Sequence, residues 1–226
     1  KATSRKLQVL DATCPLVTKV HGEAQRYARK DYTIVLVGHR DHVEVEGTVG
    51  EAPERTIVVS SVAEVEGLEV TDETKVSYLT QTTLSLDDTA EIVAALRKRF
   101  PQIEGPAKDD ICYATQNRQN AVKALAQEVD LVLIVGAANS SNTLRLVEVA
   151  QAAGVAAERI ESAEQVRPEW FKSLRRVGIT AGASAPEDIV QGIVSKLQSL
   201  VESSAVRTLE LVQEDVTFAL PAVLRA

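Results

Sequence analysis

The chain has 226 residues, 45% of them hydrophobic, and a net charge of −7. This length is sufficient for one large domain or two ordinary ones with real cores. The acidic balance argues against a nucleic-acid partner, since phosphate backbones need a basic face, and no apolar run reaches the roughly 18 residues of a membrane span.

Short β-branched runs alternate with helical patterns along the chain. The segment 87–100 predicts a helix, because acidic residues begin it, apolar side chains recur on one face and Pro101 ends it. Strands alternating with helices are typical of parallel sheets covered on both faces, so an α/β fold is expected. In chain order we expect strands at 8–12, 32–38, 55–61, 76–80, 130–136 and 176–180, and further helices at 14–31, 112–130, 143–154 and 186–200.

The chain contains an internal repeat. Cys14 and Cys112 each begin a helix-like segment that leads into an apolar strand ending in glycine, at Gly38 and Gly136. The two cysteines and the two glycines have the same offset in the sequence. We therefore predict two pseudo-symmetric α/β units of about 100 residues each, a normal domain size. The units are expected at 14–108 and 109–200, with overhangs at 1–13 and 201–226.

The two cysteines have two interpretations. A free cysteine is often a small buried hydrophobe. Here, however, both occupy equivalent positions at helix starts, where the helix dipole favours a thiolate. Thiolates that meet on a pseudo-symmetry axis in a reducing, cytoplasmic compartment indicate a metal or cluster site. Two are too few for a stable cubane, and a third copy of the unit would supply a third.

Polar segments follow the predicted strands at 38–48, 80–85, 136–142 and 180–188. Ligands of open α/β sheets bind just beyond the carboxyl ends of the strands, so these segments are candidate ligand loops. The first holds His39, His42 and Glu44, which could form a zinc site or simply a polar loop.

The sequence "NSSN", residues 139–142, follows an apolar run and precedes an amphipathic segment. Asn and Ser cap helices, which accounts for one of these side chains. Four small polar residues at a helix N-terminus also form a phosphate cradle that needs no lysine. Ser184 adds a hydroxyl at a second helix start, and His42 could add a positive donor. The residues therefore predict a bound phosphate or diphosphate.

Six motifs occur in order over essentially the whole chain: "DATCPLVTKVH", "GHRDHVEVEGT", "TQTTLSLDDT", "DDICYATQNRQNAV", "NSSNTLRLVEVA" and "GITAGASAPEDIV". Together they resemble the 4-hydroxy-3-methylbut-2-enyl diphosphate reductase family, which acts last in the methylerythritol phosphate route to isoprenoids. The resemblance implies a three-domain trefoil around a central [4Fe–4S] cluster with one cysteine from each domain.

The resemblance assigns Cys14 and Cys112 to the second and third of these domains. It makes residues 1–13 a remnant of a first domain that is absent here, and it implies that the tail 201–226 packs on that domain. The implied diphosphate ligands are His42, Ser140, Ser141, Asn142 and Ser184.

The implied reaction is reductive dehydroxylation to isopentenyl and dimethylallyl diphosphate. Glu44 would deliver protons and Thr82 would orient the substrate hydroxyl. Electrons would come from a ferredoxin or a flavodoxin. The implied location is the cytoplasm, or the plastid stroma in a plant or alga.

Three other interpretations stay open at the level of the sequence. The first is a non-redox protein that binds a phosphorylated metabolite on the same loops. The second is a zinc hydrolase that uses His39, His42 and Glu44. The third is an inactive structural or regulatory fragment.

Overall fold

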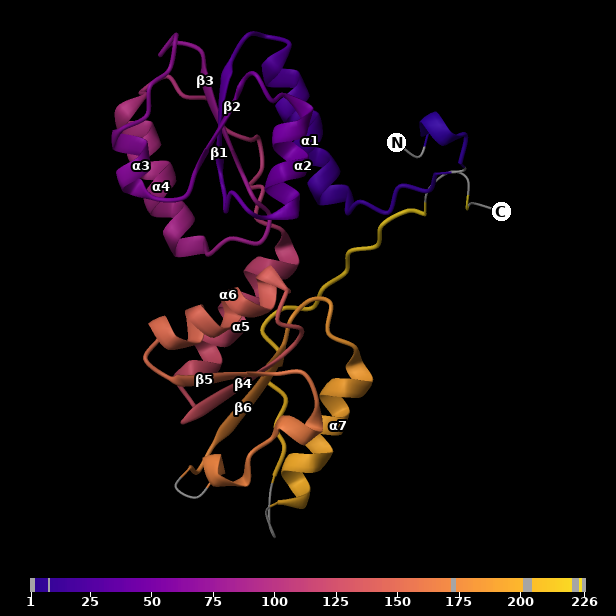
Figure 1. The fold of residues 1–226 in the computed structure, drawn as a ribbon. Coiled ribbons are helices and arrows are strands. Elements are labelled where there is room, and N and C mark those ends of the chain that lie inside the picture. Colours follow the sequence, from indigo (N-terminus) through magenta and orange to yellow (C-terminus); the bar gives the residue numbers. More distant parts are fainter. Residues whose placement is uncertain (1–2, 8, 172–173, 201–204, 221–223, 225–226) are drawn as a thin grey trace.

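The computed structural model describes residues 3–7, 9–171, 174–200, 205–220 and 224. Two parallel three-stranded sheets, each covered by helices on both faces, confirm the predicted α/β class (Figure 1). We call the sheet β2-β1-β3 with helices α1 to α4 the first unit, and the sheet β5-β4-β6 with helices α5 to α7 the second unit.

The first unit is built around the apolar strand β1. Its strands are β1 (Thr33–Val37), β2 (Thr56–Val59) and β3 (Val76–Thr80), and its helices are α1 (Pro15–Ala28), α2 (Val43–Glu51), α3 (Val62–Glu66) and α4 (Leu86–Arg99). Successive side chains of a strand point to opposite faces of its sheet. Ile34 and Leu36 therefore pack with α1 and α2, while Val35 and Val37 pack with α3 and α4. Figure 1 shows these helix pairs on opposite sides of the sheet.

The second unit repeats this arrangement. Its strands are β4 (Leu131–Val135), β5 (Ala156–Ile160) and β6 (Val177–Ala181), and its helices are α5 (Tyr113–Ala126), α6 (Ser141–Ala152) and α7 (Glu187–Ser199). The central strand β4 is wholly buried. Val132 and Ile134 pack in the cluster that includes α5 and α6, and Leu133 packs in the one that includes α7. Short 3-10 turns occur at Thr3–Arg5, Ala163–Gln165 and Pro168–Phe171.

Three sequence predictions differ from the structure. The strand expected at 8–12 does not form over 9–12, where Val9 and Leu10 are exposed, and residue 8 lies outside the described residues. Strand β5 was not predicted, because at the edge of its sheet it carries the polar Glu158 and Arg159. The segment expected as a loop at 38–48 contains the first part of helix α2, whose buried Val45 packs against the sheet.

Among the described residues, the two ends of the chain beyond the units contain neither α-helix nor strand. Residues 205–220 have no regular secondary structure and are mostly exposed. The domain limits at 108/109 and the packing partner of the tail stay predictions. Within the described ranges, the model contains no helix that is both long enough and apolar enough to span a membrane.

Candidate functional site

The two units meet at the loop that follows β3, residues 81–85. The Cys112 N–H donates to the Thr82 carbonyl at 3.0 Å, so the start of α5 is joined directly to this loop. Gln119 of α5 donates from Nε2 to the Leu84 carbonyl at 2.7 Å and accepts from the Leu86 N–H at 3.0 Å. The carboxyl end of β3 is thereby fixed to the second unit, which brings the predicted site residues of both units together.

Glu44 and Thr82 form a closely bonded pair. The Glu44 carboxylate accepts from the Thr82 N–H at 2.6 Å and from the Thr82 hydroxyl at 3.0 Å. Burial raises the pKa of Glu44, and the nearby Asp110 adds to the rise, while the bonds from Thr82 oppose it. The structure therefore places a carboxyl with a raised pKa beside the hydroxyl of Thr82, the other predicted catalytic residue.

His42 is the N-terminal cap of α2. Its Nδ1 accepts from the Glu44 N–H at 3.2 Å, so the ring proton lies on Nε2. Burial, followed by the effect of His39, lowers the pKa of His42. The lowered pKa favours the uncharged ring, whose donor is the Nε2–H, and the positive donor expected from the sequence stays a prediction.

The start of α6 carries three predicted anion ligands. Ser140 caps the helix, because its Oγ accepts from the Thr143 N–H at 3.3 Å. Ser141 Oγ lies 3.1 Å from Thr83 Oγ1 and accepts from Gln81 Nε2 at 3.4 Å, so it bridges to the loop after β3. The helix cap therefore uses the side chain of Ser140 alone, as the sequence suggested, and Ser141 is free to contact the first unit.

Asn142 is the most informative residue of this helix start. Its side chain is buried, with 6% of the residue exposed, yet neither Oδ1 nor Nδ2 has a hydrogen-bond partner. Buried polar groups are nearly always paired, and an exception needs an explanation such as a functional role or the binding of an ion or water. A free amide donor beside a helix N-terminus suits an anionic ligand.

Ser184 lies in the turn between β6 and α7 and is exposed. Helix α7 begins at Glu187 with Pro186 as its cap, so Ser184 precedes the cap by two residues and does not form it. The same turn contains Gly182, where a Cβ would overlap the Thr143 side chain. The turn is thus held directly against the start of α6.

Both cysteines cap a long helix and both thiols are free. Cys14 is exposed at the start of α1, and Cys112 is half-buried at the start of α5. The Cys112 Sγ accepts from the Thr115 N–H at 3.3 Å. Lys19 of α1 donates to Asp110 at 2.9 Å, which ties the helix of Cys14 to the segment that leads to Cys112. Two accessible thiols at helix N-termini fit the chemistry of thiolate ligands.

The zinc interpretation of His39, His42 and Glu44 is not supported. His39 bonds to Arg145, and the Glu44 carboxylate bonds to Thr82. Among the residues that the structure describes, no three or more Cys, His, Asp or Glu side chains come together as a metal site. The two cysteines would therefore supply only part of a ligand set.

Sequence reasoning missed residues that hold the site together. Gln81 is buried, and its Oε1 accepts from the His39 N–H at 3.1 Å. Asp110 accepts from the Thr80 N–H at 3.0 Å, and burial raises its pKa. Both belong to quoted motifs, but residue type alone does not reveal a carboxylate or an amide that bonds to a distant backbone.

Comparisons with known proteins show the family of this chain. The family model described as "LytB protein" matches residues 1–198. The 4-hydroxy-3-methylbut-2-enyl diphosphate reductase of Mycolicibacterium paratuberculosis is 52% identical over 226 residues, which cover 100% of this chain and 68% of that protein. The reductase of the same name from Aromatoleum aromaticum is 54% identical, with 100% and 72% covered.

A solved structure shows the same fold. The structure of the E-1-hydroxy-2-methyl-but-2-enyl-4-diphosphate reductase from Plasmodium falciparum superposes with a TM-score of 0.94 at 38% identity, and covers 98% of this chain and 70% of that one. The resemblance drawn from the six motifs is thereby confirmed. The chain belongs to the LytB family.

Proposed function

We propose that the protein reduces 4-hydroxy-3-methylbut-2-enyl diphosphate to isopentenyl and dimethylallyl diphosphate, the activity for which its relatives are named. The reaction replaces a carbon-bound hydroxyl by hydrogen, consumes two electrons and two protons, and releases water. The observation that carries the proposal is the buried, unpartnered amide of Asn142 at the start of α6. That amide offers a diphosphate-binding group at a site where Glu44 and Thr82 supply a proton and a hydroxyl.

The diphosphate would be bound by neutral donors. These are the Asn142 amide, the hydroxyls of Ser140, Ser141 and Ser184, and the His42 Nε2–H. The chain has a net charge of −7, so its overall electric field does not attract an anion. The attraction would come from local donors and from the N-terminus of a helix.

Glu44 would hold and deliver the proton. A carboxyl whose pKa is raised by burial stays protonated at a higher pH than one in water. Its hydrogen bonds to the Thr82 N–H and hydroxyl keep it in one orientation. Thr82 can exchange that hydroxyl contact for one to the substrate hydroxyl, which would place the leaving group beside its proton donor.

Cys14 and Cys112 would act as thiolate ligands of a [4Fe–4S] cluster. Such a cluster supplies single electrons and an electrophilic iron when it is bound. The protein's own residues bind the diphosphate, orient the hydroxyl and move the proton. A ferredoxin or flavodoxin would be the electron donor, and the compartment stays a prediction from the sequence: the cytoplasm, or the plastid stroma in a plant or alga.

The test uses the full-length native protein, purified anaerobically, with reduced ferredoxin and 4-hydroxy-3-methylbut-2-enyl diphosphate. Mass spectrometry should detect both products. Glu44→Gln should lower turnover by about 10²–10⁴-fold, the usual contribution of a positioned acid. The control Glu46→Gln, an exposed residue of the same helix, should stay within about twofold of wild type.

The alternative of a non-redox phosphometabolite-binding protein predicts a different result. In that case the protein would bind inorganic diphosphate through the same loops but form neither product. Absence of product from protein with full iron and sulfide content would refute the reductase proposal, whereas diphosphate binding by a protein that takes up neither iron nor sulfide would favour this alternative.

A further inference from the structure

We propose that Arg145 is a positioning residue, which holds the diphosphate-binding start of α6 at a fixed distance from the loop that carries His42 and Glu44. This inference rests on the proposed function. Arg145 was not among the residues singled out by the sequence, and it touches none of the predicted diphosphate ligands in the contacts of the described residues.

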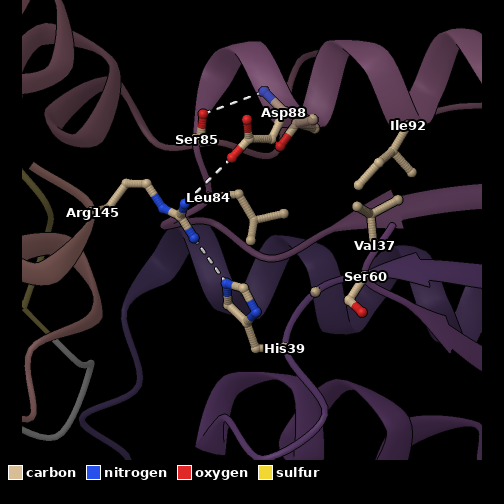
Figure 2. Close-up of a pocket in the computed structure, with 10 residues that line it drawn as sticks. Val37, His39, Ser60, Leu84, Ser85, Asp88, Ile92 and Arg145 are labelled. Atoms are coloured by element: carbon tan, nitrogen blue, oxygen red, sulfur yellow. Dashed lines mark hydrogen bonds and ion pairs between the residues drawn. The ribbon is translucent and has the colours of Figure 1, made fainter. Parts of the chain in front are cut away.

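The guanidinium of Arg145 crosses from the second unit to the first. It extends from the second turn of α6, with only 14% of its side chain exposed. Nη2 lies 2.9 Å from His39 Nε2, and Nη1 lies 3.4 Å from Asp88 Oδ2. Figure 2 shows the Arg145 side chain extending from α6 to a position between the side chains of His39 and Asp88. A further ion pair to Glu148 of its own helix orients the side chain.

Each partner of Arg145 belongs to a segment that forms the site. His39 lies two residues after the end of β1 and precedes the cap residue His42, and its N–H is bonded to Gln81. Asp88 lies in the first turn of α4, directly after the 81–85 loop. Arg145 of α6 thus contacts two segments of the first unit, and these two segments hold the proton donor Glu44 in place.

The contact with His39 has a defined direction. A guanidinium can only donate hydrogen bonds, so in this contact His39 Nε2 is the acceptor. A side chain of the same size without an acceptor at this position would lose the contact. This requirement allows a conservative replacement to be distinguished from a disruptive one.

The cavity beside Arg145 is too small for the substrate. Its volume is about 80 Å³, and it is lined by Val37, Ser60, Leu84, Asp88 and Thr89 among others (Figure 2). Ligand pockets usually have volumes of roughly 300–1,000 Å³. A cavity of this size has room for a few water molecules at most. We therefore infer that the Arg145 guanidinium binds His39 and Asp88 of the first unit and does not bind the diphosphate.

This geometry predicts an effect on turnover that exceeds the effect on binding. Ser140, Ser141 and Asn142 lie on α6 itself and would move together when Arg145 is lost. Their affinity for an isolated anion should change little. The distance from the bound diphosphate to Glu44 would change, and a misplacement of about 1 Å can cost roughly 100-fold in rate.

The experiment compares Arg145→Met, His39→Leu, His39→Gln and the double variant Arg145→Met/His39→Leu in the full-length holoenzyme. The matched control is Arg40→Met, because Arg40 follows His39 but, among the described residues, bonds within the first unit, to Glu64 and the Val58 carbonyl. Calorimetry with inorganic diphosphate gives Kd and the number of binding-competent sites. Turnover is then expressed per competent site, which removes any effect of partial unfolding.

We expect Arg145→Met and His39→Leu each to lower kcat per site by about 30-fold, with the Kd of diphosphate within about threefold of wild type. The double variant should be no slower than either single variant, since both remove one contact. His39→Gln keeps an acceptor near the position of Nε2 and should retain most of the activity. Unchanged kcat in Arg145→Met, or single effects that multiply in the double variant, would overturn the proposal.

Hydrogen exchange separates this inference from the proposed function. Amides of residues 38–44 should exchange faster in Arg145→Met and His39→Leu but not in Arg40→Met. If wild type forms no product but exchange responds in this way, the reductase proposal fails and the positioning role stands. If wild type is active and neither kcat nor exchange responds, the positioning role fails alone.

Discussion

Replacing Asn142 by alanine should weaken anion binding without weakening the fold. The amide is buried with no partner for Oδ1 or Nδ2, so in the ligand-free protein its removal breaks no hydrogen bond. A buried polar group left unsatisfied costs about 1–3 kcal/mol. Relief of that cost offsets the small cavity left by the substitution, which contributes about 1 kcal/mol in the opposite direction.

The same substitution has a larger effect when an anion is bound. A hydrogen bond to a charged group contributes about 1.5–3 kcal/mol, and each 1.4 kcal/mol is a factor of ten in Kd. One bond from Nδ2 to a diphosphate oxygen therefore predicts a Kd that rises by about 10–150-fold. The free energy of unfolding without ligand should stay within about 1 kcal/mol of wild type, or increase.

The assay combines urea unfolding without ligand and calorimetry with inorganic diphosphate. Asn139→Ala is the matched control, because Asn139 belongs to the same motif but is exposed. It should change neither quantity. Two results would refute the reasoning. A loss of more than about 2 kcal/mol in Asn142→Ala would mean that the amide has a structural partner. An unchanged Kd would mean that the amide does not face the diphosphate.

Three further predictions concern the pH dependence, the cluster and the loop after β4. Burial raises the pKa of Glu44, so the neutral carboxyl contributes stability that is fully present below the ordinary pKa of 4.5 and is lost as the pH rises through the folded pKa. Urea unfolding as a function of pH should show this loss in wild type and not in Glu44→Gln. Parallel profiles of the two proteins would contradict the prediction. Cys112→Ser should abolish bound iron and sulfide while circular dichroism stays unchanged, because serine also caps helices; full iron content would remove Cys112 from the ligands. Gly136→Ala should cost more than about 2 kcal/mol in thermal or urea unfolding, since Gly136 has a φ of +155° and a Cβ would overlap Thr143; a neutral result would show that the loop can shift.

The buried strands could be predicted because their signal is local. Strands β1 and β4 are continuous apolar runs ending in glycine, a pattern that needs cover on both faces and therefore indicates a parallel sheet. Helix α2 was missed because Gly47, Gly50 and three valines make its intrinsic helix propensity low. Its helical state depends on the packing of Val45 against the sheet, and that packing is not visible in a local pattern.

The site shows the same division between residue identity and arrangement. Residue types were enough to select the start of α6, because phosphate binding requires particular functional groups. The roles of Glu44 and Thr82 came from the resemblance of their motifs to the family. The charge of His42 could not be derived from the sequence, since its pKa depends on burial and on the position of His39. Asp110, Gln81 and Arg145 were not selected, since their roles depend on backbone groups and side chains far away in the sequence.

The amino-acid sequence by itself determined the α/β class, the two-fold internal repeat and the functional groups of the site, because these follow from the period of apolar residues and from covalent chemistry. The tertiary structure alone decided which of those groups meet. Thr82 bonds to Glu44 within the first unit, Arg145 reaches His39 across the two units, and the Asn142 amide is left without a partner in the packed structure. Contacts between groups 38 to 106 positions apart in the chain are set by packing, and no local pattern specifies them.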